Sequence, residues 1–299
     1  MRLQPSLLAE GFLFAESPRW HAARRRFFIS DIDRGQVFEI SPSGERRLVY
    51  QAPGWVSGLA FEGSRHMLVV QALARKLVRI DLDDPDKGAE AVASAEALAR
   101  FGLNDMIRRP DGFCYVATVD FDFAAHARGE GESRPSVLAC IAPDGTATAA
   151  TREVNFPNGM AIGPDGARLI VADSLDERLY AFALLEDGKL GPRALFAAMP
   201  GEMPDGISLD ASGAVWVASH HRVLRVAEGG EVLDEVDMGP TRATACMLGG
   251  EDGRTLLITA SDSHDRQVIT KSPSGRLFTV RVDTPGAGLP SVYASEARP

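Results

Sequence analysis

The sequence predicts an all-β fold made of six similar units, and three observations carry that prediction. The 299 residues include 29 glycines and 18 prolines spread along the chain, which is typical of many short strands joined by turns. A β-rich pattern of two runs ending in a turn returns six times, roughly every 40–55 residues. A short loop-to-strand segment precedes each repeat of this pattern. Together these features indicate a six-bladed β-propeller that forms one domain over residues 1–299.

The paired runs carry β-branched and aromatic residues without a helical period, as in the Val-Trp-Val-Ala-Ser run of residues 215–219. The paired runs of the six units begin at Phe27, His66, Phe113, Arg168, Val215 and Thr255. Two segments fall outside this pattern. Ala89–Arg100 is alanine-rich and is interpreted as a possible helix inserted at the surface. Ala124–Pro135 is polar and glycine-rich, and we expect a mobile loop over one face of the disc.

The segment that introduces each unit is expected to form the innermost strand of a blade. These segments begin at Gly11, Gly54, Phe101, Phe156, Met203 and Thr244. In a propeller, the starts of the innermost strands surround one central channel, although the segments lie far apart in the chain. Side chains at matched positions of these segments are therefore expected to converge on the axis.

Composition excludes several classes of protein. The net charge of −9 argues against a nucleic-acid-binding surface, and no apolar run is long enough to span a membrane. Cys114, Cys140 and Cys246 each lie in an apolar strand-like run, so we expect buried free thiols in a reducing cytoplasm. The N-terminal segment has no small-residue cleavage site and is expected to start the mature fold. A monomer or weak homodimer is expected.

Four oxygen-bearing side chains occupy matched positions of the innermost strands. They are Glu16 in E-S-P, Asn104 in L-N-D-M, Asn158 in P-N-G-M and Asp205 in P-D-G-I. Asn-Gly and Asp-Gly pairs are also common turn sequences, so each residue alone could be a turn former. Their shared position favours a central metal-binding channel, because carboxylate and amide oxygens suit hard divalent ions such as Ca²⁺, Mg²⁺ or Mn²⁺.

Four longer stretches make the sequence resemble the senescence marker protein / gluconolactonase / luciferin-regenerating enzyme family of regucalcin-like six-bladed propellers. They are E-S-P-R-W, G-L-N-D-M, F-P-N-G-M-A-I-G-P-D-G-A-R-L-I-V-A-D-S and M-P-D-G-I-S-L-D-A-S-G-A-V-W-V-A. The resemblance implies that Glu16, Asn158 and Asp205 bind the metal, and that Asn104 holds substrate or a metal-bound water. It implies one divalent cation as cofactor, with Ca²⁺ ranked first and Mg²⁺, Mn²⁺, Zn²⁺ or Fe²⁺ as alternatives.

One departure from the family concerns substrate binding. Members that act on sugar lactones carry an arginine two residues before the Asn of the N-D motif, whereas this chain has Gly102 there and its nearest arginine is Arg100. A smaller or more apolar lactone is then as plausible as an aldonolactone. The family also places an acidic residue after the second strand of the third blade; Asp120 and Asp122 both fall there, and Asp122 matches better.

The activity that we infer is hydrolysis of a lactone ring, a small-molecule substrate. The cation would polarise the lactone carbonyl and activate a bound water as nucleophile. Asp205 would act as metal ligand and general base. Asn104 would orient the substrate or the water. Asn104, Arg100 and Asp122 are the predicted substrate-binding residues. An ester or phosphotriester hydrolase on the same scaffold, and a non-catalytic Ca²⁺-binding propeller, are the alternatives. One or two aromatic or apolar side chains near the inner-strand starts are expected to wall the pocket, from Phe12, Phe14, Trp20, Trp55, Phe156 and Met160.

Overall fold

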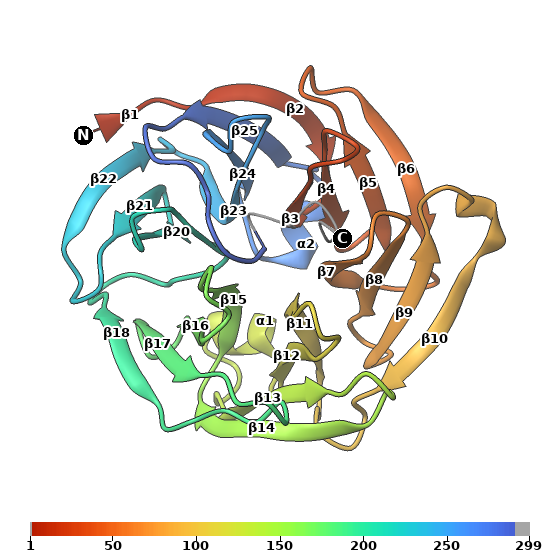
Figure 1. The fold of residues 1–299 in the computed structure, drawn as a ribbon. Coiled ribbons are helices and arrows are strands. Elements are labelled where there is room, and N and C mark those ends of the chain that lie inside the picture. Colours follow the sequence, from red (N-terminus) through yellow and green to blue (C-terminus); the bar gives the residue numbers. More distant parts are fainter. Residues whose placement is uncertain (1, 291–299) are drawn as a thin grey trace.

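Six β-sheets, antiparallel except for one short edge strand, are arranged around a central axis in the computed structural model, which describes residues 2–290 (Figure 1). The predicted all-β, six-bladed β-propeller is therefore confirmed. The predicted domain limits of 1 and 299 lie outside the described residues. Each sheet is one blade, and blades are numbered here by the position of their innermost strand in the chain. No helix among the described residues is both long and apolar enough to cross a membrane.

Within each blade the strands follow one another from the axis to the rim of the ring. Blade 1 contains β3 (Ala15–His21), β4 (Arg26–Asp31), β5 (Gln36–Ile40) and β6 (Arg46–Gln51); blade 2 contains β7 (Val56–Glu62), β8 (His66–Gln71), β9 (Lys76–Asp81) and β10 (Ala89–Ser94); blade 3 contains β11 (Gly102–Arg108), β12 (Cys114–Val119), β13 (Ser136–Ile141) and β14 (Ala147–Val154). Blade 4 contains β15 (Pro157–Ile162), β16 (Arg168–Asp173), β17 (Arg178–Ala183) and β18 (Ala194–Ala198); blade 5 contains β19 (Ile207–Leu209), β20 (Val215–Ser219), β21 (Arg222–Val226) and β22 (Val232–Asp237); blade 6 contains β23 (Arg242–Gly249), β24 (Thr255–Ser261) and β25 (Gly275–Arg281).

The N-terminal segment closes the ring. Strand β2 (Ser6–Phe12) pairs antiparallel with β25 and forms the outermost strand of blade 6, so the first and last parts of the propeller share one sheet. The two-residue strand β1 (Arg2–Leu3) pairs parallel with β22 at the edge of blade 5. This closure gives every blade two neighbours.

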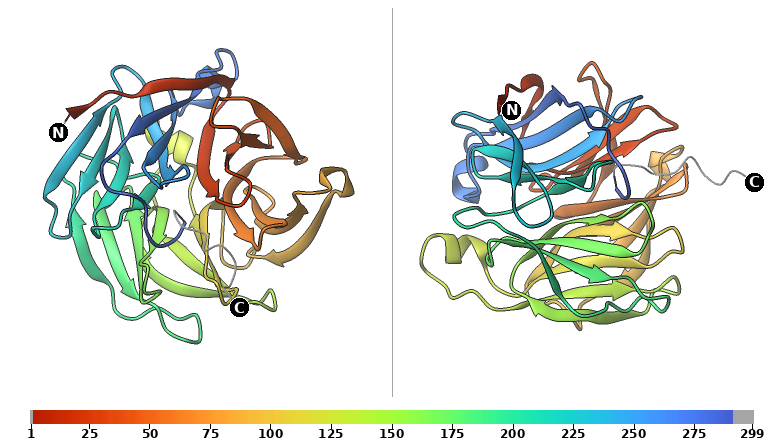
Figure 2. Two further views of the ribbon diagram at one scale, coloured as in Figure 1. Left: turned by 45° about the horizontal axis from the view of Figure 1, so that its top comes forward. Right: turned by 60° about the vertical axis from the view of Figure 1, so that its left-hand side comes forward.

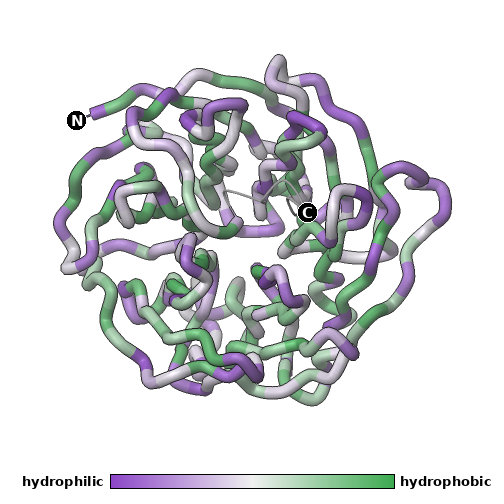
Figure 3. Tube along the Cα trace, in the orientation of Figure 1, coloured by the Kyte–Doolittle hydropathy of each residue, from purple (hydrophilic) through white to green (hydrophobic). Residues whose placement is uncertain are grey.

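Apolar side chains fill the six spaces between neighbouring blades. One cluster joins blades 1 and 2 through residues such as Phe28 and Val69, and another joins blades 6 and 1 through Leu257 and Phe27. The middle strands are buried on both faces, which is why their sequences are almost continuously apolar. Figure 3 shows hydrophobic colour concentrated along the strands and hydrophilic colour at many of the turns.

The helix predicted over Ala89–Arg100 is wrong, because no part of this segment is helical. Ala89–Ser94 forms β10, which pairs antiparallel with β9 from Ala89 opposite Ile80 to Ser94 opposite Lys76. Alanine is the strongest intrinsic helix former, but tertiary context can override this preference: the open edge of β9 offers hydrogen bonds that complete the blade. Only turns follow Ser94, and a short 3₁₀ turn, Pro85–Lys87, precedes β10.

Two single-turn helices lie on the same face of the ring (Figure 2, right). Helix α1 (Phe123–Ala127) falls in the segment 124–135 that was predicted as loop, and α2 (Arg266–Ile269) lies between β24 and β25. Asp122 accepts a hydrogen bond from the Ala125 N–H and Asp265 accepts one from the Gln267 N–H, so a carboxylate caps each helix. The rest of segment 124–135 forms turns and irregular structure, as predicted.

Candidate functional site

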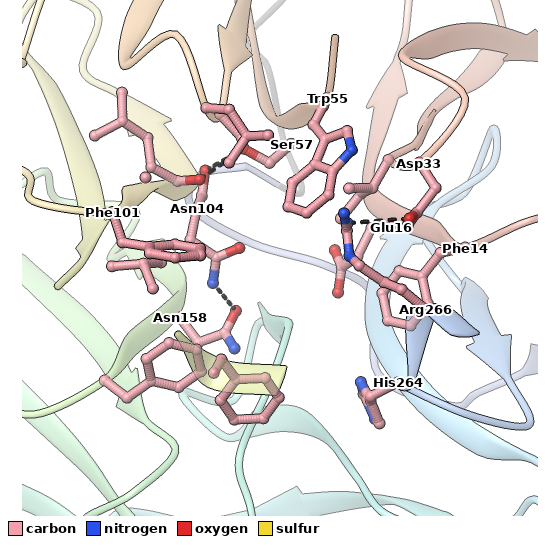
Figure 4. Close-up of a pocket in the computed structure, with 18 of the residues that line it drawn as sticks. Phe14, Glu16, Asp33, Trp55, Ser57, Phe101, Asn104, Asn158, His264 and Arg266 are labelled. Atoms are coloured by element: carbon pink, nitrogen blue, oxygen red, sulfur yellow. Dashed lines mark hydrogen bonds and ion pairs between the residues drawn. The ribbon is translucent and has the colours of Figure 1, made fainter. Parts of the chain in front are cut away.

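A cavity of about 300 Å³ opens where the innermost strands meet. Glu16, Asn104, Asn158 and Asp205, the four residues predicted to converge, all line it. They come from β3, β11, β15 and the segment before β19, which belong to four different blades. In Figure 4 the side chains of Glu16, Asn104 and Asn158 point into one common space.

A β-bulge places the polar residue in several innermost strands. The pairing register shifts between Glu16 and Arg19 in β3, between Leu103 and Met106 in β11, and between Pro157 and Met160 in β15. A bulge bends the strand and redirects a side chain that would otherwise alternate with its neighbours. Asn104 and Asn158 fall inside such a shift and Glu16 immediately precedes one, and all three line the cavity.

Glycine follows two of these residues because the innermost strands approach closely there. A Cβ at Gly159 would lie 2.6 Å from the Asp205 carbonyl oxygen, and a Cβ at Gly206 would lie 2.6 Å from the Ala245 Cα. The Gly159 N–H donates to that Asp205 carbonyl at 3.2 Å, so β15 and the segment before β19 are bonded directly. The glycines of P-N-G and P-D-G therefore serve close packing around the axis.

Hydrogen bonds connect the polar residues around the cavity. The Asn104 amide donates to Asn158 Oδ1 at 3.2 Å, and the Asn158 amide donates to Ser174 Oγ at 3.3 Å. The Ser57 hydroxyl donates to the Asn104 carbonyl at 2.8 Å (Figure 4). The two amides are therefore held with Asn158 Oδ1 towards Asn104, in fixed orientations at the cavity floor.

Glu16 and Asp205 are buried acids without an opposite charge bound to them. Their exposed fractions are 8% and 9%, and neither forms an ion pair within residues 2–290. Burial, together with the charge of Asp105, raises the pKa of Glu16 to about 8. Burial and then the charge of Glu16 raise the pKa of Asp205 well above its ordinary value. Nearby Arg19 pairs instead with Asp105, at 2.7 Å.

A divalent cation fits this set of donors. Two carboxylates would balance a 2+ charge, and their shared burial is costly unless a cation or protons neutralise them. The described residues contain no group of three or more His, Cys, Asp or Glu side chains able to hold a metal. Beside the two carboxylates, the amide oxygen of Asn158 is a donor available at the cavity for such an ion, and the metal part of the predicted central channel remains a proposal.

Only some of the predicted substrate-binding residues line the cavity. Asp122 lines the cavity with Asn104, and so does the backbone of Gly102. Arg100 is exposed and is not among the described residues that line the cavity; its N–H donates to Asp120. Asp120 is buried and also accepts a hydrogen bond from Thr118. Of the two acids considered, Asp122 is therefore the one at the cavity.

The cavity also contains residues that the sequence did not single out. Ser57 occupies in blade 2 the position that Asn104 has in blade 3, within a register shift between Val56 and Leu59, so its matched position was a usable signal. Asp33, Phe101, Phe123, His264 and Arg266 come from loops and helix ends and carried no such signal. Of the six predicted wall residues, Phe14, Trp55 and Phe156 line the cavity, whereas Phe12, Trp20 and Met160 belong to the cores between blades.

Two of these additional residues have shifted pKa values. Burial lowers the pKa of Arg266 to about 10, while Asp33, 3.1 Å from the guanidinium, favours the charged form. Arg266 is therefore a cation near neutral pH. Its guanidinium also lies over the Trp55 ring. Burial, with the charge of Arg242, lowers the pKa of His264 to about 4. His264 therefore presents an uncharged imidazole to the cavity (Figure 4).

Comparison with known proteins agrees with this architecture. A sequence model described as the SMP-30/Gluconolactonase/LRE-like region matches residues 14–262. The "6-deoxy-6-sulfogluconolactonase" of Pseudomonas putida is 31% identical over 96% of this chain and 95% of its own, and the "Pentonolactonase XacC" of Haloferax volcanii is 24% identical over 95% and 94%.

A crystal structure described as the calcium-binding protein regucalcin from Agrobacterium tumefaciens has the same fold. It superposes with a TM-score of 0.81 at 22% identity, covering 96% of this chain and 97% of that one. The residues that the family model matches include Glu16, Asn104, Asn158 and Asp205, the four polar residues of the cavity. The chain therefore belongs to the SMP-30/gluconolactonase/LRE-like family.

Proposed function

We propose that the protein is a lactonase that depends on one divalent cation held by Glu16, Asn158 and Asp205. The observation that carries the proposal is a pair of buried carboxylates that share a cavity and lack a paired cationic side chain among the described residues. Support for the substrate class comes from the two relatives above, which are named for lactones of sugar acids. We rank Ca²⁺ first, because a structural neighbour is described as calcium-binding and all donors are oxygens.

A divalent cation bound there would supply Lewis-acid stabilisation of negative charge on the lactone carbonyl oxygen and would make a water more acidic. Asp205 would take the proton from the attacking water and return it to the ring oxygen as the acyl C–O bond breaks, giving a hydroxy acid. Asn104 would donate its amide to substrate or water, since its orientation is fixed by Asn158 and Ser57. Asp122 would contact the substrate from the edge of α1.

The decisive experiment measures lactone hydrolysis in a pH-stat with metal-stripped protein, before and after adding back Ca²⁺, Mg²⁺, Mn²⁺, Zn²⁺ or Fe²⁺. We expect activity only with an added ion, and we expect Asp205→Asn and Glu16→Gln to lose both turnover and ion binding by calorimetry. Asp144→Asn is the matched control, because Pro143-Asp144-Gly145 repeats the P-D-G sequence in an exposed turn.

Several outcomes would reject the proposal. Full turnover by Asp205→Asn would remove the assigned base, and turnover by the stripped protein would remove the cation. Faster hydrolysis of an aryl ester or phosphotriester than of any lactone would favour the alternative hydrolase. Tight ion binding without hydrolysis of any substrate would favour a non-catalytic Ca²⁺-binding propeller.

We also propose a reducing compartment, the cytoplasm, as the site of action, supported by Cys114, Cys140 and Cys246, which are all buried free thiols as predicted. The expected monomer or weak homodimer stays a prediction that light scattering can test.

A further inference from the structure

One wall of the central cavity is made of aromatic rings. Six ring-bearing residues line the cavity: Phe14, Trp55, Phe101 and Phe156 precede the innermost strands of blades 1 to 4, Phe123 belongs to α1, and His264 lies in the loop before α2. Phe123 and Phe156 are parallel, with ring centroids 4.9 Å apart and an interplanar angle of 3°. The centroid of the His264 ring lies 5.3 Å from that of Phe14 and 6.4 Å from that of Phe123, so Phe14, His264, Phe123 and Phe156 form one continuous surface.

This surface continues onto an apolar rim. Leu73 is 43% exposed and Phe101 is 41% exposed, and both line the cavity. Large apolar side chains left open to water at a concave site mark the place where a ligand covers them. Phe101 lies beside Asn104 of blade 3 (Figure 4), and Leu73 comes from the turn between β8 and β9 of blade 2.

Several polar side chains beyond the candidate cation residues already have partners within the protein. Ser57 donates to the Asn104 carbonyl, Asp122 accepts from the Ala125 N–H, and Asp33 pairs with Arg266. Gly102 lines the cavity without offering any polar side chain. A lactone with several hydroxyl groups would leave some of them without partners against the rings, and unpaired buried hydroxyls oppose binding.

We propose that the substrate is a lactone bearing a planar apolar substituent, such as a phenyl group, which stacks on the aromatic wall while the ester carbonyl faces Glu16, Asn158 and Asp205. The inference rests on the proposed lactonase function and narrows its substrate class. The reaction is the same: water adds to the acyl carbon, the acyl C–O bond of the ring breaks, and the ring oxygen takes the proton. The apolar substituent is bound and is not changed.

The test compares kcat/KM for γ-phenyl-γ-butyrolactone, unsubstituted γ-butyrolactone and D-glucono-1,5-lactone, with the ion that supports activity. We expect the phenyl lactone to be preferred to each of the others by at least about tenfold, as for other apolar pocket contacts. The Phe123→Ala variant should reduce the phenyl-to-unsubstituted ratio by about tenfold or more. Preference for the gluconolactone, or an unchanged ratio in Phe123→Ala, would overturn the inference.

Phe113→Ala is the matched control. Phe113 is also half-buried, but it packs on Arg109 and on the core between blades 3 and 4, outside the cavity. Its removal should leave the substrate ratio as in wild type. A similar fall of the ratio in both variants would mean that the effect comes from general destabilisation, and the wall would lose its assigned role.

Binding of unreactive analogues separates this inference from the proposed function. Calorimetry with 5-phenyl-2-pyrrolidinone and with 2-pyrrolidinone measures the contribution of the phenyl group without hydrolysis. Tighter binding of the phenyl lactam, lost in Phe123→Ala, supports the aromatic wall even if no lactone is hydrolysed, in which case only the lactonase proposal fails. Hydrolysis of gluconolactone together with equal binding of the two lactams would overturn the inference alone.

Discussion

Arg19 of the E-S-P-R-W stretch is a structural residue at the centre of the ring. Its guanidinium donates to Asp105 at 2.7 Å and also to the carbonyl oxygens of Leu59 and Met106. The side chains of Arg19 and Asp105 are 3% and 8% exposed. One buried cation therefore ties the innermost strands of blades 1, 2 and 3 together and leaves Glu16, three residues earlier, without an ion partner.

We predict that Arg19→Met lowers the free energy of unfolding by about 3–5 kcal/mol, because Asp105 is left buried without its counter-charge. Urea denaturation measures the change. Arg281→Met is the control, since the Arg281–Asp252 pair lies in solvent and its loss should change stability little. A loss no larger than that of the control would show that the buried pair does not hold the three strands.

A second prediction at this scale concerns Glu16 in the metal-stripped protein. Burial raises the pKa of Glu16 to about 8 from an ordinary value of 4.5, so the folded chain retains a proton that the unfolded chain releases. The stability from this proton is complete below pH 4.5 and is lost as pH rises through about 8. We expect the Tm of the stripped protein to fall between about pH 5 and 8.5, and an added divalent cation to raise Tm more at pH 8 than at pH 6.

Thermal melts across this pH range, with and without cation, measure the effect. The decline should be shallower in Glu16→Gln, which has no proton to lose at this position. Equal slopes in wild type and variant, or an equal effect of the cation at both pH values, would contradict the assignment.

At the scale of elements, the innermost strands combine a bulge that directs the polar residue inwards with a glycine that allows close approach. Asp205 and Gly206 precede β19, and the Gly206 N–H donates to the Thr244 carbonyl of β23 at 3.0 Å. Ala245 fills the space that a side chain at position 206 would need.

We predict that Gly206→Ala separates β19 from β23, lowers stability by about 1–3 kcal/mol as in other overpacked sites, and reduces activity through displacement of Asp205. Gly54→Ala is the control, because a Cβ there meets no atom within 4 Å. Denaturation and kcat/KM measure the two effects. Unchanged activity in Gly206→Ala would show that the position of Asp205 does not depend on this contact.

At the scale of the whole molecule, the ring is closed by a single strand from the other end of the chain. Strand β2 pairs with β25, and Phe12 at its end is fully buried in the core between blades 6 and 1. Every blade is stabilised by two neighbours, so loss of one contact weakens the whole ring rather than one blade.

We predict that the full chain unfolds in one calorimetric transition, with equal calorimetric and van't Hoff enthalpies. Deletion of residues 1–12 should abolish this transition, because it removes Phe12 and exposes the β25 edge. Deletion of residues 1–5 removes only β1 and should preserve it. Two separate transitions in the full chain, or a cooperative transition in the longer deletion, would contradict this picture.

Much of this architecture could be predicted because each blade of a propeller repeats the same local sequence pattern of strands and turns. The inner-strand segments that begin at Gly11 and Gly54, for example, became β3 and β7 without change of order. The prediction for Ala89–Ser94 was wrong because alanine favours helix locally, whereas pairing with β9 decided its conformation. Burial in the wedge between two blades likewise explains why the 215–219 run is apolar on both faces.

The sequence by itself determined the sixfold repeat and the polar set of Glu16, Asn104, Asn158 and Asp205, since equivalent positions of a closed repeat must meet at the axis. Only the tertiary structure decided what surrounds them. Asp33, His264 and Arg266 reach the cavity from loops and helix ends whose spacing follows no repeat, and Arg100, two residues before the expected position, is exposed at the surface. The reason is physical: strand position is set by a local period, whereas the cavity wall is set by how separate segments pack against one another.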